Sequence, residues 1–293
     1  MVSKTPLVSV IVNCYNGEEY LAVALESVVG QSYQNWELIL WDNFSTDNSA
    51  RIVESFNEPR FKYFRATNFT SLPIARNEAI KVAKGAFICF LDVDDYWDFN
   101  KLKLQLACFT DPNVGVVSSY YNLLEERGDI SKIQVIKPRI ISHENLICEY
   151  SLHFSSVMIR MEALDRLEAI FNPVYEIIQD FDLIVRLALT TEVRVLNKPL
   201  SYYRWHGNNF GNSSMNKLLS EKEHWLVNNM FLSEKLNLNC LERSINWYKA
   251  YSEMSAGRLK QSLYYVNKLR SLDLLKFCYY FLLILLKFKP IDN

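Results

Sequence analysis

Residues 86–97, AFICFLDVDDYW, join an apolar run to a cluster of carboxylates. Residues 86–91 predict a strand of a parallel sheet that is covered on both faces. Asp92, Asp94 and Asp95 follow directly where that strand ends. Carboxylates this close together repel one another unless a cation lies among them, and Mg²⁺ and Mn²⁺ prefer such oxygen ligands. An acidic turn in which Asp95 caps the following helix explains the same residues, so both interpretations stay open.

The chain before this strand alternates strands and helices. The pattern predicts strands at Leu7–Val12, Glu37–Trp41 and Phe61–Phe64, and helices at Glu18–Val29, Ser45–Phe56 and Pro73–Lys84. A further strand is expected at Val114–Ser118. This order predicts an α/β fold with a mostly parallel sheet and helices on both faces.

The chain after Tyr120 is less regular. Strands predicted at Phe154–Ile159 and Val193–Leu196 flank a helix near Asp180–Leu189, and beyond Ser220 only helices are expected, including a pair at Arg258–Leu269 and Asp273–Phe288. We therefore expect one domain over residues 1–215, with halves 1–110 and 111–215. A C-terminal helical extension is expected over residues 216–293.

Two more polar loops follow predicted strands, Asn13–Glu19 and Asp42–Asp47. Because the carboxyl ends of parallel strands meet at one edge of a sheet, both loops should converge with the carboxylate cluster. Asp42 either accepts a hydrogen bond from a base N–H or caps a turn. Arg76, on the preceding helix, either faces the same edge or is a solvated surface residue.

Composition narrows the class of protein. Lys and Arg number 32 against 33 Asp and Glu, so no basic excess suggests nucleic-acid binding. None of the six cysteines forms a C-x-x-C pair, which favours free thiols in a reducing compartment. The N-terminal apolar run reads as a buried strand, so we expect a cytoplasmic protein. Phe277–Leu286 is apolar, flanked by lysines and too short to span a bilayer, which leaves a core helix or peripheral contact with the inner membrane face.

Three segments together resemble the nucleotide-binding half of the family 2 glycosyltransferases with the GT-A (Rossmann-like) fold. They are PLVSVIVNCYNGEEYLAVALESVVGQSY, WDNFSTDNS and ARNEAIKVAKGAFICFLDVDDYW, in order between about Pro6 and Gln105. The resemblance continues more weakly through FSSVMIRMEAL, QDFDLIVRL and YYRWHGNNFGNSS, so it covers residues 6–214. It implies that residues 1–110 bind the nucleotide and that residues 111–215 form the acceptor half.

The resemblance also implies roles for single residues. The nucleotide would be bound by Asn13, Cys14, Tyr15, Glu19, Asp42, Arg76, Asp92 and Val93, with Asp42 reading a uracil-type base edge. Asp94 would bind a divalent cation, Mn²⁺ or Mg²⁺, with Asp92 contacting the ribose or a metal-bound water. Asp180 would be the catalytic base. His206 would contact the metal near a closing segment at Ser213–Ser214, although a hydrogen-bonded loop histidine is equally consistent.

The implied reaction is inverting transfer of a sugar from a nucleoside diphosphate, by default UDP, to an acceptor hydroxyl. The acceptor would be a saccharide or lipid-linked saccharide in cell-surface polysaccharide or lipopolysaccharide synthesis. Two positions depart from the family pattern: Asn13-Cys14 stand where Pro-Thr is usual, and Gln179 stands where a Glu precedes the catalytic Asp. A degenerate nucleotide-sugar-binding protein is therefore an alternative. A sugar nucleotidyltransferase is less consistent, because the loop after the first strand has one glycine and is acidic.

Overall fold

The computed structural model describes residues 5–127, 130–136, 146–147, 150–206, 209, 215–234, 236, 238–255 and 258–268. The chain forms two compact units, Met1–Ser213 and Ser214–Asn293. Three sequence predictions lie outside the described residues: the helix at Asp273–Phe288, the apolar run within it and the Ser213–Ser214 segment.

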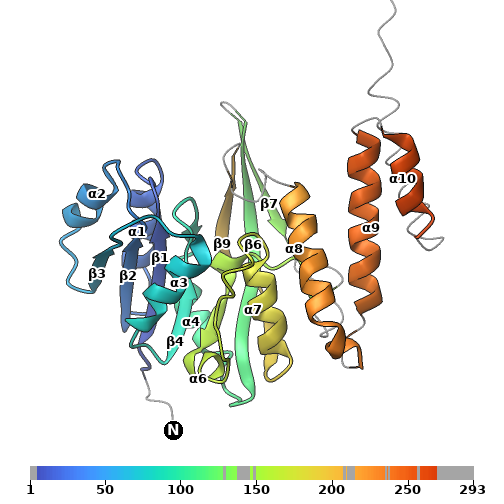
Figure 1. Cartoon of the computed structure of the whole chain (residues 1–293). Coiled ribbons are helices and arrows are strands. Elements are labelled where there is room, and N and C mark those ends of the chain that lie inside the picture. Colours follow the sequence, from blue (N-terminus) through green and yellow to red (C-terminus); the bar gives the residue numbers. More distant parts are fainter. Residues whose placement is uncertain are drawn as a thin grey trace, which may run out of the picture. The chain divides into compact units, whose positions relative to one another are not determined.

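The first unit is built on a sheet with nine described strands in the order β3-β2-β1-β4-β8-β6-β9-β5, with β7 paired to β6 (Figure 1). The strands are β1 (Val8–Cys14), β2 (Trp36–Asp42), β3 (Phe61–Arg65), β4 (Phe87–Phe90), β5 (Tyr96–Trp97), β6 (Val114–Arg127), β7 (Ile130–Ile136), β8 (Met158–Arg160) and β9 (Glu192–Trp205).

Six of these nine strands run in one direction. β3, β2, β1 and β4 pair in parallel, and so do β6 and β9. The short strand β8 runs antiparallel to both β4 and β6, which makes β6 and β9 point the same way as β4. The predicted α/β fold with a mostly parallel sheet is therefore confirmed.

Alternating residues of β1 enter two separate cores, because successive side chains of a strand point to opposite faces. Ile11 joins a core with α3 (Leu72–Lys81), α6 (Met161–Leu164) and α7 (Gln179–Ala188). Val10 and Val12 join another with α1 (Leu21–Val29), α2 (Ser49–Ser55) and α4 (Lys101–Leu106). The helices therefore cover both faces of the sheet.

The strand predicted at Phe154–Ile159 is wrong in its first half. Phe154–Ser156 forms a 3₁₀ turn, and β8 starts only at Met158. Tertiary hydrogen bonds account for the difference. Ser155 Oγ donates to the Asp95 carboxylate at 2.6 Å, and Ser156 Oγ lies 2.8 Å from Ser118 Oγ.

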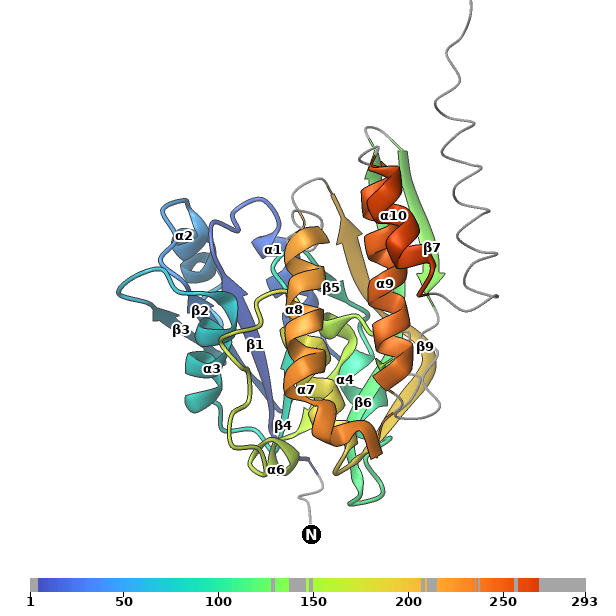
Figure 2. The ribbon, with the colours of Figure 1, turned by 45° about the vertical axis from the view of Figure 1, so that its right-hand side comes forward.

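The second unit has helices α8 (Met215–Asn228), α9 (Leu238–Ser255) and α10 (Leu259–Val266), with a 3₁₀ turn at Met230–Glu234 (Figure 2). α10 packs against α9, where Ser262 Oγ donates to the Ala250 carbonyl at 2.8 Å.

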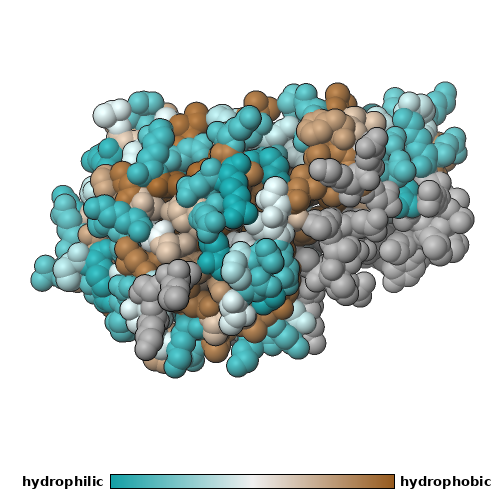
Figure 3. Space-filling view, turned by 90° about the horizontal axis from the view of Figure 1, so that it is seen from below, coloured by the Kyte–Doolittle hydropathy of each residue, from teal (hydrophilic) through white to brown (hydrophobic). Residues whose placement is uncertain are grey.

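Cys240 is disulfide-bonded, so the prediction of free thiols is wrong for this residue, while Cys14, Cys89 and Cys108 are free. None of the described helices is long and apolar enough to cross a membrane. On the face shown in Figure 3, the hydrophobic residues drawn in colour lie in small groups separated by hydrophilic ones.

Candidate active site

A pocket of about 280 Å³ lies where the strands β4 and β9 end. Arg76, Asp92, Asp94 and Asp180 all line it, although they come from different segments of the chain. The structure therefore brings together the predicted carboxylate pair, the predicted base and the arginine of α3. The pocket is also lined by Gln179 and by residues to which the sequence gave no role, among them His153, Glu176, Tyr203 and Asn209.

Arg76 joins α3 to the carboxylate loop. Its Nη2 donates to Asp92 Oδ1 at 2.8 Å, and the side chain is only 5% exposed against 40% for Asp92. The guanidinium lies 4.7 Å from the centre of the Phe154 ring. Arg76 thus faces the pocket, as one of the two sequence interpretations held. Its carboxylate partner there is Asp92.

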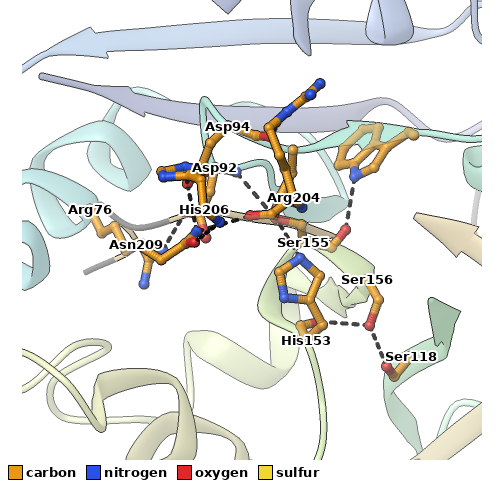
Figure 4. A network of polar contacts seen from close by, with 12 residues as sticks. Arg76, Asp92, Asp94, Ser118, His153, Ser155, Ser156, Arg204, His206 and Asn209 are labelled. Carbon is orange, nitrogen blue, oxygen red and sulfur yellow. Dashed lines mark hydrogen bonds and ion pairs between the residues drawn. The ribbon is translucent and has the colours of Figure 1, made fainter. Parts of the chain in front are cut away.

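Asp94 receives two donors from the segment that follows β9. Its Oδ2 lies 3.2 Å from His206 Nε2 and 3.2 Å from Asn209 Nδ2 (Figure 4). Burial, reinforced by the charges of Asp95 and Asp92, raises the pKa of Asp94 to about 7. Such a crowded carboxylate gains most from a nearby cation.

The residues fit a magnesium-like cation that is shared with a ligand. No group of three or more His, Cys, Asp or Glu side chains in the described part of the chain is arranged to hold a metal ion alone. Mg²⁺ in nucleotide sites is typically held by one or two carboxylates together with phosphate oxygens and water. Asp94, with Asp92 beside it, supplies that donor set.

Asp95 is held by the protein from three sides and is 2% exposed. Its Oδ2 lies 2.6 Å from His153 Nε2 and 2.6 Å from Ser155 Oγ, and its Oδ1 accepts from the Arg204 N–H at 3.2 Å. The interpretation that Asp95 caps the next helix is therefore wrong, since α4 begins at Lys101 with Asn100 at its N-cap.

The end of β9 lies against the carboxylate loop (Figure 4). Arg204 Nε donates to the Asp94 carbonyl at 3.1 Å, and its guanidinium lies 4.8 Å from the centre of the Tyr20 ring. The His206 ring stacks on the same Tyr20 ring, with centroids 5.2 Å apart and 19° between the planes. Tyr20 and Arg204 were missed from the sequence. The signal for Arg204 was its place between the aromatic residues of YYRWH at a strand end.

Asp180 lies in the first turn of α7 and is half-buried. Its Oδ2 accepts a hydrogen bond from the Tyr150 hydroxyl at 3.1 Å. Burial raises the pKa of Asp180, while the Phe181 N–H, Arg76 and Tyr150 oppose that rise. A carboxyl with a raised pKa is the better proton acceptor once it is ionised.

The remaining predicted nucleotide residues lie outside this pocket. Val93 packs against the loop after β1, since a Cβ built on Gly17 would lie 3.4 Å from its Cβ. Cys14 is 1% exposed, and burial raises the pKa of its thiol. Glu19 is exposed.

Asp42 is 1% exposed and accepts hydrogen bonds from its own loop and from β3. Oδ1 accepts from the Ser45 N–H at 2.7 Å, and Oδ2 accepts from the Tyr63 hydroxyl at 2.5 Å. The turn interpretation of Asp42 therefore describes its contacts in this structure. Base recognition by Asp42 stays a prediction.

Two features of this edge suit a planar base. Tyr15 is 51% exposed and Phe69 is 55% exposed, and their ring centroids lie 4.6 Å apart. Asn13 Nδ2 is buried and has no hydrogen-bond partner within the described residues. Phe69 was also missed from the sequence, because nothing in a loop before a helix distinguishes it.

Comparisons with known proteins agree with the fold. The family model described as glycosyl transferase family 2 matches residues 9–167, more than half of the chain. WfgD of Escherichia coli, named as a UDP-Glc:α-D-GlcNAc-diphosphoundecaprenol β-1,3-glucosyltransferase, is 34% identical over 48% of this chain and 55% of its own length. TuaG of Bacillus subtilis, a putative teichuronic acid biosynthesis glycosyltransferase, is 27% identical over 80% of this chain and 85% of its own.

Two solved structures show the same fold. S. aureus TarS in complex with UDP has a TM-score of 0.66 at 22% identity, covering 89% of this chain and 78% of that one. A mannosyltransferase from Pyrobaculum calidifontis with GDP-Man and Mn²⁺ has a TM-score of 0.66 at 16% identity, covering 90% and 75%. The sheet is that of GT-A glycosyltransferases. The chain therefore belongs to glycosyl transferase family 2 and is a glycosyltransferase.

Proposed function

We propose that this enzyme transfers a sugar from a UDP-sugar to an acceptor hydroxyl, with inversion and with help from a divalent cation. The observation that carries the proposal is one pocket lined by both Asp94 and Asp180. The acceptor is a saccharide or lipid-linked saccharide in surface polysaccharide synthesis. WfgD and TuaG, whose names give such pathways, support this part of the proposal.

The residues divide the chemistry between them. Residues 1–110 hold the nucleotide, with Tyr15 and Asn13 beside the base. Asp94 and Asp92 hold the cation, with His206 next to them. A cation held there would act as a Lewis acid and offset negative charge on the leaving diphosphate.

Asp180 takes the proton from the acceptor hydroxyl as its oxygen attacks the sugar. Residues 111–215 form the wall on this side of the pocket. Direct displacement needs one base and no covalent sugar–enzyme intermediate. A single carboxylate on the acceptor side of the pocket therefore suffices.

The first test is calorimetric titration of UDP with and without Mn²⁺. We expect binding that requires Mn²⁺ and that Asp94→Asn abolishes. Asp165→Asn, at an exposed carboxylate directly after α6, is the matched control and should bind like the wild type. If none of UDP, GDP, dTDP and CMP binds, the transferase proposal is overturned. Binding that does not require the metal would overturn the cation site.

A second test separates catalysis from binding. Asp180→Asn should abolish turnover of UDP-sugars and retain UDP binding. A wild-type chain that binds nucleotide and turns over no donor would support the degenerate alternative, to which Gln179 points.

The membrane contact is tested by vesicle flotation. The apolar stretch Phe277–Leu286 with its flanking lysines supports peripheral attachment at the inner membrane face. We expect the full chain to float with anionic vesicles and a chain ending at Ser271 to remain in the bottom fraction. Equal flotation of both would exclude this anchor.

A further inference from the structure

Tyr150 and Asp180 are thirty residues apart in sequence and meet beside the pocket. The Tyr150 hydroxyl donates to Asp180 Oδ2 at 3.1 Å. The Tyr150 ring stands edge-on to the Phe181 ring, with centroids 5.6 Å apart and 90° between the planes. Since Phe181 follows Asp180 on α7, this ring contact holds the hydroxyl to one side of the carboxylate.

The chemistry of the pair fixes which partner is the donor. Burial, with the charge of Asp180 adding to it, raises the pKa of Tyr150 well above its ordinary value of 10.0. The phenol therefore stays protonated at every pH at which the enzyme would work. The hydrogen bond from Tyr150 in turn lowers the pKa of Asp180 against the larger effect of burial.

We infer that Tyr150 is a positioning residue for Asp180: its hydroxyl orients the carboxylate in the pocket and stabilises its ionised form. The inference rests on the proposed function, in which Asp180 is the base. It assigns a role to a residue that contacts neither nucleotide nor cation. It also explains how a half-buried acid that forms no ion pair within the described residues is kept ready to accept a proton.

Other ionisable groups line the pocket beside Asp180. They are Arg76 from α3, Asp92 and Asp94 from the loop after β4, His153 before β8, Glu176 before α7 and Tyr203 from β9. Arg76, which stays cationic throughout the profile, lowers the pKa of Asp180. Tyr150→Phe changes none of these groups and retains the ring that packs on Phe181, so a change in titration reports the hydroxyl alone.

The experiment is the pH profile of kcat/KM for Tyr150→Phe with a UDP-sugar donor. We expect kcat to fall about five- to tenfold, the size of one lost hydrogen bond, with UDP affinity unchanged. Without the hydroxyl the ionised form of Asp180 is less stable, so the acidic limb should move to higher pH. Tyr33→Phe removes a hydroxyl that donates to the Pro6 carbonyl far from the pocket, and its profile should match the wild type.

An unmoved acidic limb in Tyr150→Phe would overturn the inference, even if kcat fell. Full turnover by Asp180→Asn would instead overturn the proposed function, whatever Tyr150→Phe does. Should Tyr150→Phe fail to fold, 3-fluorotyrosine at position 150 provides the test, since its more acidic hydroxyl should move the limb to lower pH.

Discussion

His153 Nε2 lies 2.6 Å from Oδ2 of Asp95, a carboxylate next in sequence to the proposed metal ligand. The side chains are 12% and 1% exposed, so the pair is largely buried beside the carboxylate loop. His153, which precedes β8, thus fixes the position of the loop that presents Asp92 and Asp94. The geometry of that loop is set by protein contacts, and those contacts can be tested separately from ligand binding.

The His153–Asp95 pair should make stability depend on pH. Burial lowers the pKa of His153, but the Asp95 carboxylate outweighs burial and raises the pKa above the ordinary value of 6.5. A histidine whose pKa is higher in the folded state stabilises the fold fully below its unfolded pKa, and this contribution disappears as pH rises through the folded pKa. His153→Gln should therefore cost about 2 kcal/mol at pH 5.5 and less at pH 9.

Urea unfolding of both proteins without metal at the two pH values measures this difference. A loss that is the same at both pH values would show that His153 acts through packing alone.

Arg76 should be sensitive to the shape of the cation as well as to its charge. Its guanidinium lies near the rings of Phe154 and Phe171, at 4.7 and 5.5 Å, while it pairs with Asp92. Arg76→Met should lower the free energy of unfolding by about 2 kcal/mol, as for a desolvated cation–π contact. Because a planar guanidinium stacks where an ammonium does not, Arg76→Lys should recover less than half of that loss.

Thermal unfolding of the three proteins decides the point. Full recovery by lysine would mean that charge alone matters at this position.

Tyr15 and Phe69 should bind the base without supporting the fold. Both rings are more than half exposed and contact each other. Tyr15→Ala and Phe69→Ala should each weaken UDP binding at least fivefold, since stacking on an aromatic ring contributes about 1–3 kcal/mol per base. The melting temperature should not change.

Phe99→Ala, at another exposed ring, is the control for calorimetry and should bind UDP normally. Unchanged affinity in both test variants would place the base elsewhere.

Gly85 should tolerate no side chain. A Cβ there would lie 2.5 Å from the Ser9 nitrogen and 2.6 Å from the Phe87 carbonyl oxygen, and both are backbone atoms of the sheet. Gly85→Ala should destabilise the protein by about 1–3 kcal/mol, as for other overpacked sites.

Gly30→Ala is the matched control. Its φ is −72° and its Cβ would contact only the Glu26 carbonyl, at 3.2 Å. A larger loss in urea unfolding for Gly30→Ala than for Gly85→Ala would contradict this account.

Apolar runs predicted the centre of the sheet well. Strands that are covered on both faces, such as β1, β2 and β4, are continuous apolar runs and can be recognised from sequence alone. Their observed ends differ from the predicted ones by at most two residues. β5 has only two residues and no periodicity to read. The 3₁₀ turn at Phe154–Ser156 looks like a strand in sequence because its geometry comes from distant partners.

The candidate site, too, could be predicted where a local sequence pattern exists and could not where distant contacts decide. Asp92, Asp94, Arg76 and Asp180 could be named, because each belongs to a motif or a strand end with recognisable spacing. Tyr150 and His153 could not, since their roles depend on Asp180 and Asp95, which are far away in sequence. Cys14 was named for its motif, yet its thiol points into the core.

The reversed strand β8 has an evolutionary consequence. In a wholly parallel sheet, only segments that follow strands reach the catalytic edge, and segments that precede them lie at the back. Because β8 runs against its neighbours, the stretch Tyr150–Val157 before it reaches the front, where Leu152, His153 and Phe154 line the pocket. Under the proposed function, selection can reshape acceptor preference in this stretch without changing the loops that are proposed to bind the donor.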